Sequence, residues 1–277
     1  MKKYCYFNGK IIESKKASLP INDIGVIRGY SIFDYFRTYN GRLFRLSDYY
    51  KRFKKSAKSI GFDIPISQKE LESILLKLLK KNKDTDSAFR LVLTGGASSN
   101  SISLESKGNF YVIAENLPKI DPKYYKEGAK LITSEYQRQI PESKTASYIH
   151  AVKLQGEKKK AGAMEILYHY NGKVLECSTS NIFVIKNGVL KTPEKNVLHG
   201  ITRKTIIELA KENGFKVAEK DIKMSEVWNA DEVLITSSGK AMVLPIVKID
   251  DKKISSGKVG PISEYLINAF RELTSNN

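Results

Sequence analysis

The sequence is poor in the residues that bind metals and form disulfides. Among 277 residues there are two cysteines, three histidines and one tryptophan. Cys5 and Cys177 provide no disulfide framework, which favours a reducing compartment and predicts a cytoplasmic protein. His150, His169 and His199 share no metal-ligand spacing, so the sequence predicts no metal site.

Long apolar runs and the common nucleotide and hydrolase motifs are also missing. No apolar run approaches the roughly 18 residues of a membrane span, and Asn8-Gly9 interrupts the segment where a signal peptide would lie. No GxGxxG follows a predicted strand, Gly239-Lys240 lacks the upstream glycine of a P-loop, and no GxSxG is present. We therefore expect no membrane segment, no Rossmann nucleotide site and no serine-hydrolase elbow.

Acidic residues are the minority of the charged residues, 30 against 47 Lys and Arg, which leaves a net charge of +17. Such a balance raises the question of nucleic-acid binding. The excess, however, is spread along the whole chain and is mostly lysine; its longest cluster, 158–160, is typical of a solvated helix face. We interpret the charge as a source of solubility and of attraction for small anions, and expect neither a nucleic acid nor a membrane as partner.

Asn-Gly pairs punctuate both halves of the chain and predict β-hairpins, because a tight hairpin turn needs two positive φ angles. The hairpins predicted in this way join Lys3–Phe7 to Lys10–Ile12, Tyr35–Tyr39 to Leu43–Arg45, Glu165–Tyr170 to Lys173–Leu175, and Ile182–Lys186 to Val189–Lys191. The pattern indicates an antiparallel sheet in each half.

Helices are indicated by capping residues followed by apolar residues at helical spacing. Ser67 with Glu70 forms a capping box, Ser47 and Thr202 each precede an amphipathic stretch, and a last helix is expected over Pro261–Leu273. The proline-containing stretch Asn116–Tyr124 is the best linker candidate. The fold class predicted is α+β in two domains, a small one over 1–118 and a larger, strand-rich one over 119–277.

Three segments are unusual for plain scaffold. They are VIRGYSIFDYFRTYNG at 26–41, IPESKTASYIH at 140–150 and LECSTSNIF at 175–183. Each taken alone is better explained as a strand end or a loop. Composition and spacing therefore single out no catalytic residue.

Taken together with HGITR at 199–203 and SSGKAM at 237–242, the order and spacing of these segments resemble the fold-type-IV (class IV) aminotransferases, which use pyridoxal 5′-phosphate (PLP). This family includes branched-chain aminotransferases, D-amino-acid transaminases and aminodeoxychorismate lyase. The resemblance implies a small α/β sandwich domain, a larger PLP-binding domain and a homodimer. It also implies amino acids and 2-oxo acids as small-molecule partners.

The resemblance assigns roles to residues around the cofactor ring. Lys144, in ESKTASY, stands where the family has its Schiff-base lysine, which also carries the proton between substrate and cofactor. Glu176 matches the acid that pairs with the pyridine nitrogen. Tyr148 matches a tyrosine that binds the ring hydroxyl in some members, although a packing role explains it nearly as well.

Further residues match the family's phosphate contacts. Ile201 and Thr202 begin a helix, whose free N–H groups suit an anion, and Arg52 matches an arginine that binds the phosphate. Ser238 and Gly239 match a second hydroxyl-and-amide contact, with Gly239-Lys240 where relatives often carry small hydroxyl residues.

The substrate side of the resemblance favours one branch of the family. Arg28, Phe33 and Arg90 lie in segments that line the substrate side of the family's pocket, and an arginine pair suits a carboxylate. The combination is similar to a divergent group of D-amino-acid transaminases, although Arg90 could instead pair with a structural acid. The predicted function is transfer of an amino group between an amino acid, preferably a D-amino acid, and a 2-oxo acid such as 2-oxoglutarate or pyruvate. The alternatives are a branched-chain L-amino-acid aminotransferase and then aminodeoxychorismate lyase.

Overall fold

A computed structural model describes residues 1–239 and 242–275, and the chain divides into two compact units. The first unit contains Met1–Pro118 together with Ser143–Ser147. The second contains Lys119–Glu142 and the described chain from Tyr148 onward. The short segment that carries Lys144 therefore packs with the first unit, whereas the sequence-based division assigned it to the second domain.

The first unit is built on a six-stranded sheet with the order β2-β1-β6-β5-β3-β4, in which every pairing is antiparallel. Both hairpins predicted here are present. The strands are β1 (Tyr4–Phe7), β2 (Lys10–Glu13), β3 (Ser31–Tyr39), β4 (Arg42–Leu43), β5 (Ala88–Thr94) and β6 (Phe110–Glu115), and a short 3-10 helix, η1 (Ser14–Lys16), follows β2.

The helices of this unit are α1 (Ile24–Ile27), α2 (Leu46–Ser59) and α3 (Gln68–Asn82). The predicted capping box is confirmed, since Ser67 Oγ accepts from Glu70 N and Ser67 N donates to Glu70 Oε2. The prediction that Ser47 caps α2 was wrong. The N-cap residue is Arg45, which has a left-handed backbone, and the helix begins at Leu46, before Ser47. Arg45 Nε also pairs with Asp48 Oδ2 of the first turn at 2.6 Å.

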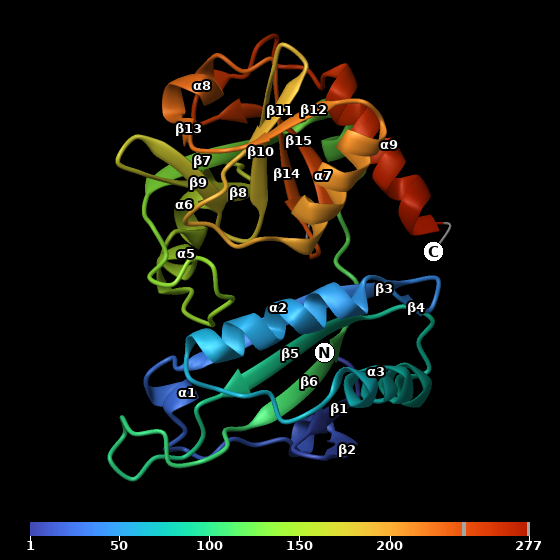
Figure 1. Cartoon of the computed structure of the whole chain (residues 1–277), viewed down its shortest axis with the longest axis vertical. Coiled ribbons are helices and arrows are strands. Elements are labelled where there is room, and N and C mark those ends of the chain that lie inside the picture. The colour runs from blue at the N-terminus through green and yellow to red at the C-terminus, as the bar shows by residue number, and fades with distance from the viewer. Residues whose placement is uncertain (240–241, 276–277) are drawn as a thin grey trace. The chain divides into compact units, whose positions relative to one another are not determined.

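One face of this sheet is covered by α2, which lies across the strands in Figure 1. The rings of Phe36 on β3 and Tyr49 on α2 are 5.2 Å apart. Because strand side chains alternate, the even-numbered residues of β3 face this helix, and the odd-numbered residues point to the opposite, half-exposed face. That opposite face carries part of the candidate site.

The second unit contains a ten-stranded sheet in the order β12-β11-β10-β14-β15-β7-β8-β9-β13, with β16 paired to β15. Its strands are β7 (Ala129–Glu135), β8 (Glu165–Tyr170), β9 (Lys173–Cys177), β10 (Asn181–Lys186), β11 (Val189–Thr192), β12 (Lys216–Glu219), β13 (Ile222–Lys223), β14 (Glu232–Ser237), β15 (Met242–Ile249) and β16 (Lys252–Lys253). The two predicted hairpins β8–β9 and β10–β11 are confirmed.

The prediction of a purely antiparallel sheet was wrong for this unit. Strand β7 runs parallel to both β8 and β15, and β11 runs parallel to β12. Helices lie in the sequence between β7 and β8 and between β11 and β12. Such crossovers return the chain to the same edge of the sheet before the next strand begins, and this gives parallel pairs.

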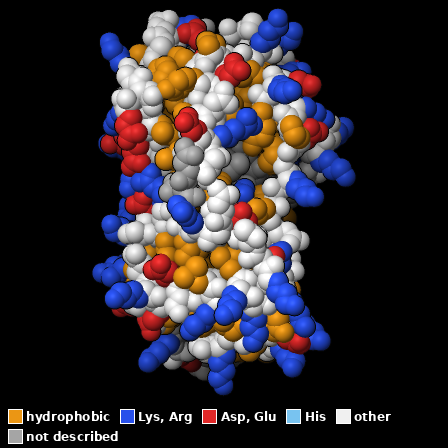
Figure 2. Space-filling model, turned by 90° about the vertical axis from the view of Figure 1, so that its right-hand side faces the viewer, with side chains coloured by type: hydrophobic (Ala, Val, Ile, Leu, Met, Phe, Trp, Pro, Cys, Tyr) orange, Lys and Arg blue, Asp and Glu red, His pale blue; other side chains and the backbone are white. Residues whose placement is uncertain are grey.

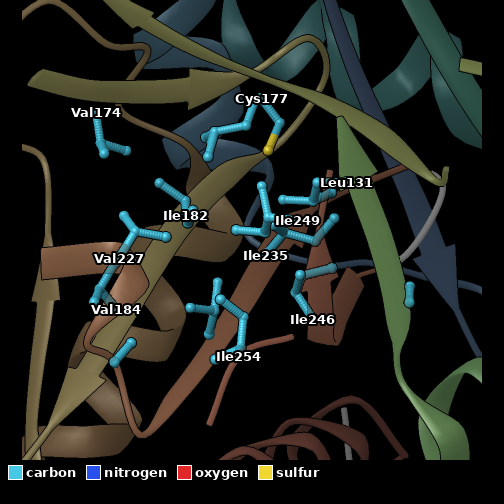
Figure 3. Packing of buried hydrophobic residues seen from close by; sticks show 14 of the residues in the cluster. Leu131, Val174, Cys177, Ile182, Val184, Val227, Ile235, Ile246, Ile249 and Ile254 are labelled. Carbon is cyan, nitrogen blue, oxygen red and sulfur yellow. The ribbon is translucent and has the colours of Figure 1, made fainter. Parts of the chain in front are cut away.

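Alternation along the strands divides the core of the second unit between the two faces of the sheet. Ile182 and Val184 of β10 lie in the cluster drawn in Figure 3, with Leu131 and Ile235. The intervening Phe183 belongs to a second cluster, against α7 and α9. The helices of this unit are α4 (Lys123–Glu127), α5 (Ile149–Lys153), α6 (Gln155–Lys160), α7 (Ile201–Glu212), α8 (Met224–Trp228) and α9 (Pro261–Ser275).

The distribution of surface charge, the hydropathy of the helices and the grouping of metal-ligating side chains concern the predictions about nucleic acids, membranes and metals. On the face in Figure 2, Lys and Arg side chains are scattered with acids between them. Within residues 1–239 and 242–275, no helix has the length and hydropathy needed to span a bilayer. The same residues contain no group of three or more His, Cys, Asp or Glu side chains arranged for a metal ion.

Candidate active site

The segment that carries Lys144 is attached to the edge of β3 in the first unit. Phe33 N donates to Lys144 O at 2.9 Å and Ala146 N donates to Ser31 O at 2.9 Å, on either side of an antiparallel bridge between Ile32 and Thr145. Lys144 N also donates to Ser56 Oγ of α2 at 3.1 Å. The backbone of Lys144 is thus held by both a strand and a helix.

Three residues singled out in the sequence meet on the half-exposed face of this sheet. The Lys144 Nζ lies 4.5 Å from the centroid of the Phe33 ring, and the Arg90 guanidinium carbon lies 5.5 Å from the same centroid. Arg90 also lies 5.0 Å from the ring of Tyr35, its partner in the β3–β5 register. The aromatic rings therefore bring a primary amine and a guanidinium to one place, where cation–π attraction holds both.

Arg90 is also paired with a carboxylate. Its Nε donates to Glu115 Oε1 at 2.7 Å and its Nη2 donates to Glu115 Oε2 at 3.3 Å. Burial and the nearby charge of Glu115 raise the pKa of Tyr35 above its ordinary value, with Arg90 and Arg37 opposing the shift. The phenol of Tyr35 is thus neutral at pH 7.

Arg28 contacts a different part of the first unit from Arg90. It is exposed after α1, and its Nε donates to Ser101 O at 3.2 Å. Within the described part of the chain no hydrogen bond or ring contact joins Arg28 to Arg90. The role of Arg28 in substrate binding stays a prediction.

Arg52 forms a buried ion pair on the α2 side of the sheet. Its Nε donates to Asp34 Oδ2 at 2.9 Å and its Nη2 donates to Asp34 Oδ1 at 2.5 Å. The side chains are 9% and 0% exposed, respectively, and the Arg52 guanidinium carbon lies 5.2 Å from the ring of Tyr49. A bidentate contact fixes the plane of the guanidinium group.

Glu176 is the centre of a second buried network, in the second unit. Arg138 Nε donates to Glu176 Oε1 at 2.8 Å, and Leu198 N donates to Glu176 Oε2 at 3.0 Å. The Arg138 and Glu176 side chains are 11% and 8% exposed. The arginine and the backbone N–H together hold the carboxylate in one orientation.

The loop that begins at Leu198 leads into α7, whose N-terminus was predicted to bind phosphate. Gly200 is the N-cap, and a Cβ atom there would lie 2.1 Å from Asn181 Oδ1, so this position needs glycine. Asn181 in turn donates from Nδ2 to Leu198 O at 2.7 Å. The close approach of Gly200 to Asn181 and the hydrogen bond from Asn181 to Leu198 hold the loop at 198–200 against β10.

Hydroxyl groups gather around this helix start. Thr202 Oγ1 and Ser238 Oγ are 3.4 Å apart, and Gly239 N donates to Ser237 Oγ. The predicted helix start at Ile201 and Thr202 is confirmed, and both residues are buried. Of the SSGKAM motif, residues 240–241 lie outside the described residues.

Tyr148 is the N-cap residue of α5 and contributes to the surroundings of Tyr168. Burial raises the pKa of the Tyr168 phenol above its ordinary range, and Tyr136, Glu165, Tyr148 and Glu176 add to the rise. The pKa of Cys177 is raised well above its ordinary value by burial, with Glu165 and Glu176 adding to the rise. A thiol with such a pKa is a packing group and no nucleophile.

Several residues that hold the site have no functional role predicted from the sequence. Asp34, Glu115 and Arg138 each pair with a residue that had been singled out, and Glu165 accepts from the hydroxyls of Ser178 and Thr179. Asp34 was visible in the sequence as the acid of the IFDYF segment. Glu115 and Arg138 have no local signal, because they lie 25 and 38 residues from their partners, and Glu165 lies in an ordinary strand.

Comparison with known proteins identifies the family. The sequence model of the amino-transferase class IV family matches residues 31–249, so the chain belongs to the class IV aminotransferases. Among curated relatives, a Methanocaldococcus jannaschii protein with the provisional name branched-chain-amino-acid aminotransferase is 33% identical over 276 residues, 97% of this chain and 95% of the relative. A D-alanine aminotransferase of Bacillus licheniformis is 32% identical over 269 residues, 96% of this chain and 95% of the relative.

Solved structures agree on the fold. The branched-chain amino acid aminotransferase of Escherichia coli matches with a TM-score of 0.92 at 25% identity, covering 100% of this chain and 96% of that one. A branched-chain enzyme from the organism abbreviated T.th., solved with pyridoxamine 5′-phosphate, matches with a TM-score of 0.92 at 27% identity, covering 100% and 95%. The chain is therefore an aminotransferase with the α+β fold of fold type IV, and its cofactor is PLP.

The residues present suit this cofactor. Ser180 Oγ and Thr236 Oγ1 are buried and have no hydrogen-bond partner among the described residues, and Thr236 pairs in register with Asn181 beside the start of α7. Buried polar groups are normally satisfied, so these hydroxyls indicate a polar ligand there. A helix N-terminus and two hydroxyls suit a phosphate, and the buried carboxyl group of Glu176 suits a ring nitrogen.

Proposed function

We propose that this protein is a transaminase that transfers an amino group between a D-amino acid and a 2-oxo acid such as pyruvate or 2-oxoglutarate, with Lys144 as the catalytic amine. The observation that carries the proposal is the convergence of Lys144 Nζ and the Arg90 guanidinium on the ring of Phe33. An amine that handles the amino group and a cation that binds the carboxylate are what an amino-acid substrate needs.

The bound cofactor supplies an aldehyde that accepts the amino group and a ring that withdraws electrons from the substrate Cα. Lys144 Nζ, held at the sheet edge, moves the proton at the substrate Cα as general base and then acid. Arg90 binds the substrate carboxylate, and the rings of Phe33 and Tyr35 exclude water from one side of it.

The residues of the second unit have complementary roles in this proposal. Glu176 would pair with the ring nitrogen of the cofactor, and Arg138 and Leu198 N hold its carboxylate in place. Thr202, Ser238, Gly239 and the N–H groups at Ile201 bind phosphate. The family resemblance also gives Arg52 a phosphate-binding role. Tyr148 donates to the ring hydroxyl.

The preference for a D-amino acid rests on the curated relatives and on the arginine pair predicted from the sequence, although Arg28 and Arg90 share no contact in the described part of the chain. D-Alanine aminotransferases are 31% to 32% identical over 96% of the chain. The branched-chain alternative has its own support, since the Methanocaldococcus jannaschii relative and the structural neighbours bear that name. The hand of the substrate is therefore the first property to measure.

The first experiment is the visible absorption of the purified PLP-loaded protein after addition of D-alanine or L-leucine to separate samples. Loss of the yellow band with D-alanine alone supports the proposal, and loss with L-leucine alone supports the branched-chain alternative. Lys144→Ala is the matched control: it should lose the lysine-linked band and turnover. Activity equal to wild type in Lys144→Ala would contradict the role given to this residue.

We also propose that the enzyme works as a homodimer. Apolar side chains near Arg28 are unusually exposed, with Ile21 91%, Ile102 73% and Val26 59% accessible. Arg28 itself bonds to the loop at Ser101. Apolar residues gathered in this way are typical of a surface that another protein covers. Light scattering in solution should give twice the mass of one chain, and a single-chain mass would contradict the proposal.

A further inference from the structure

Residues 143–147, which carry Lys144, form neither a helix nor a strand. Two backbone hydrogen bonds attach them to β3, from Phe33 N to Lys144 O and from Ala146 N to Ser31 O, both at 2.9 Å. Both bonds lie along the edge of one strand. A loop that is held along a single line can still rotate about that line, so these two bonds alone do not fix the direction of the Lys144 side chain.

Helix α2 supplies contacts that lie off this line. Ser56 Oγ accepts from Lys144 N at 3.1 Å, and three residues further along the same helix face Ser59 Oγ lies 2.5 Å from Ser143 Oγ. Ser59 Oγ also donates to Ser56 O at 2.8 Å, so its single proton is used and it accepts from Ser143. The segment is therefore docked on the helix at two consecutive residues.

The two serines of α2 differ in their access to water. Ser56 is 0% exposed, whereas Ser59 is an exposed residue. Water can take the place of the Ser59 hydroxyl, but the position of Ser56 is closed to solvent. Ser56→Ala therefore removes an acceptor that solvent does not replace, which makes Ser56 the more important of the two contacts.

The bond to Ser56 also bears on where the Lys144 side chain lies. Helix α2 covers the face of the sheet to which the even-numbered residues of β3 point, whereas Lys144 Nζ lies 4.5 Å from the ring centroid of Phe33, which points to the opposite face. The N–H group and the side chain belong to the same residue, so a directional hydrogen bond to the N–H restricts the direction of the side chain as well.

We infer that Ser56 is a positioning residue for the reaction, because its hydroxyl fixes the backbone of Lys144 and thereby the place of the amine beside Phe33. The inference rests on the proposed function, in which Lys144 is the catalytic amine. In this role Ser56 acts through the Lys144 backbone and takes no part in proton transfer. A misplacement of about 1 Å at a proton-transferring group can cost about 100-fold in rate.

The test is Ser56→Ala in the PLP-loaded protein. We expect kcat to fall about tenfold with KM nearly unchanged, because the amine is displaced while the groups that bind the substrate are kept. Backbone hydrogen exchange over residues 143–147, followed by mass spectrometry, should become about tenfold faster, with no change over β6. Ser56→Cys has a similar size and a weaker acceptor, so both effects should be smaller than in Ser56→Ala.

The control is Ser87→Ala in the same unit. Ser87 is 1% exposed and its Oγ donates to Asp84 Oδ2 at 3.0 Å, so the same substitution removes a side-chain hydrogen bond at a similar burial. Its kcat and its exchange over residues 143–147 should equal those of wild type. Unchanged kcat in Ser56→Ala, a loss carried by KM alone, or an equal loss in Ser87→Ala would overturn the inference.

Hydrogen exchange separates this inference from the proposed function, since it needs no turnover. Turnover that survives in Lys144→Ala would count against the proposed function, while the exchange rates in Ser56→Ala would still show whether Ser56 holds the segment. Exchange equal to wild type in Ser56→Ala would overturn the inference whatever the activity. Thermal melting verifies folding, and if Ser56→Ala does not fold, Ser56→Cys takes its place in both measurements with the same direction of change expected.

Discussion

Each unit of the molecule contains a buried arginine–carboxylate pair that includes a residue of the candidate site, and the two pairs differ in which member, the arginine or the carboxylate, is predicted to bind the ligand. In the first unit Asp34 holds Arg52, with side chains that are 0% and 9% exposed. In the second unit Arg138 holds Glu176, with side chains that are 11% and 8% exposed. The predicted ligand-binding member is the cation in one unit and the anion in the other.

The comparison shows what a buried ion pair can contribute. Such pairs add little net stability, because removing both charges from water costs about as much as their attraction returns. They do fix a side chain in one orientation and one charge state. A cation oriented in this way suits a phosphate, and an anion oriented in this way suits a protonated ring nitrogen.

The largest effect is expected from Glu176→Gln, which removes the ligand-binding member of its pair. Glutamine still accepts a hydrogen bond from Leu198 N but cannot hold a proton on the ring nitrogen, so kcat should fall about 100-fold. Steady-state kinetics at saturating PLP measure this change in kcat. Glu219→Gln, which breaks the Arg203–Glu219 pair in the same unit, is the control and should keep kcat. Equal losses in the two variants would mean that only folding was affected.

An intermediate effect is expected from Asp34→Asn, which removes the supporting member of its pair. Without the carboxylate, Arg52 loses its fixed plane, and the dissociation constant of PLP should rise about tenfold. Turnover at saturating PLP should stay near that of wild type, because Arg52 does not take part in proton transfer. Cofactor titration by fluorescence measures the affinity, with Asp48→Asn at the Arg45 pair as the control. A loss confined to kcat would argue against this assignment.

The smallest effect is expected from Arg138→Lys. A lysine keeps the positive charge near Glu176 but offers no planar donor edge, so the carboxylate is less well aligned. We expect kcat to fall about threefold with KM unchanged. Arg203→Lys is the matched variant and should leave kcat unchanged. If kcat of Arg138→Lys equals that of wild type, Arg138 has no positioning role.

Local signals predicted the elements of the fold well where the sequence pattern was itself local. The four Asn-Gly pairs gave four real hairpins, and the Ser67–Glu70 box gave a real helix start. The parallel pairing of β7 with β8 and β15 was missed, because pairing across a helix or between distant strands leaves no trace in neighbouring residues. The start of α2 was missed because Arg45 adopts a left-handed backbone, which side-chain preferences do not predict.

Residue types along the chain predict the chemistry of the candidate site: a lysine in ESKTASY, a glutamate before a hydroxyl-rich run and a glycine before a helix. Folding determines which neighbours hold these residues. It attaches the Lys144 segment to β3, pairs Glu176 with Arg138, and pairs Arg90 with Glu115. Charge and hydrogen-bonding capacity belong to each side chain, whereas its orientation and burial come from neighbours that are distant in the chain.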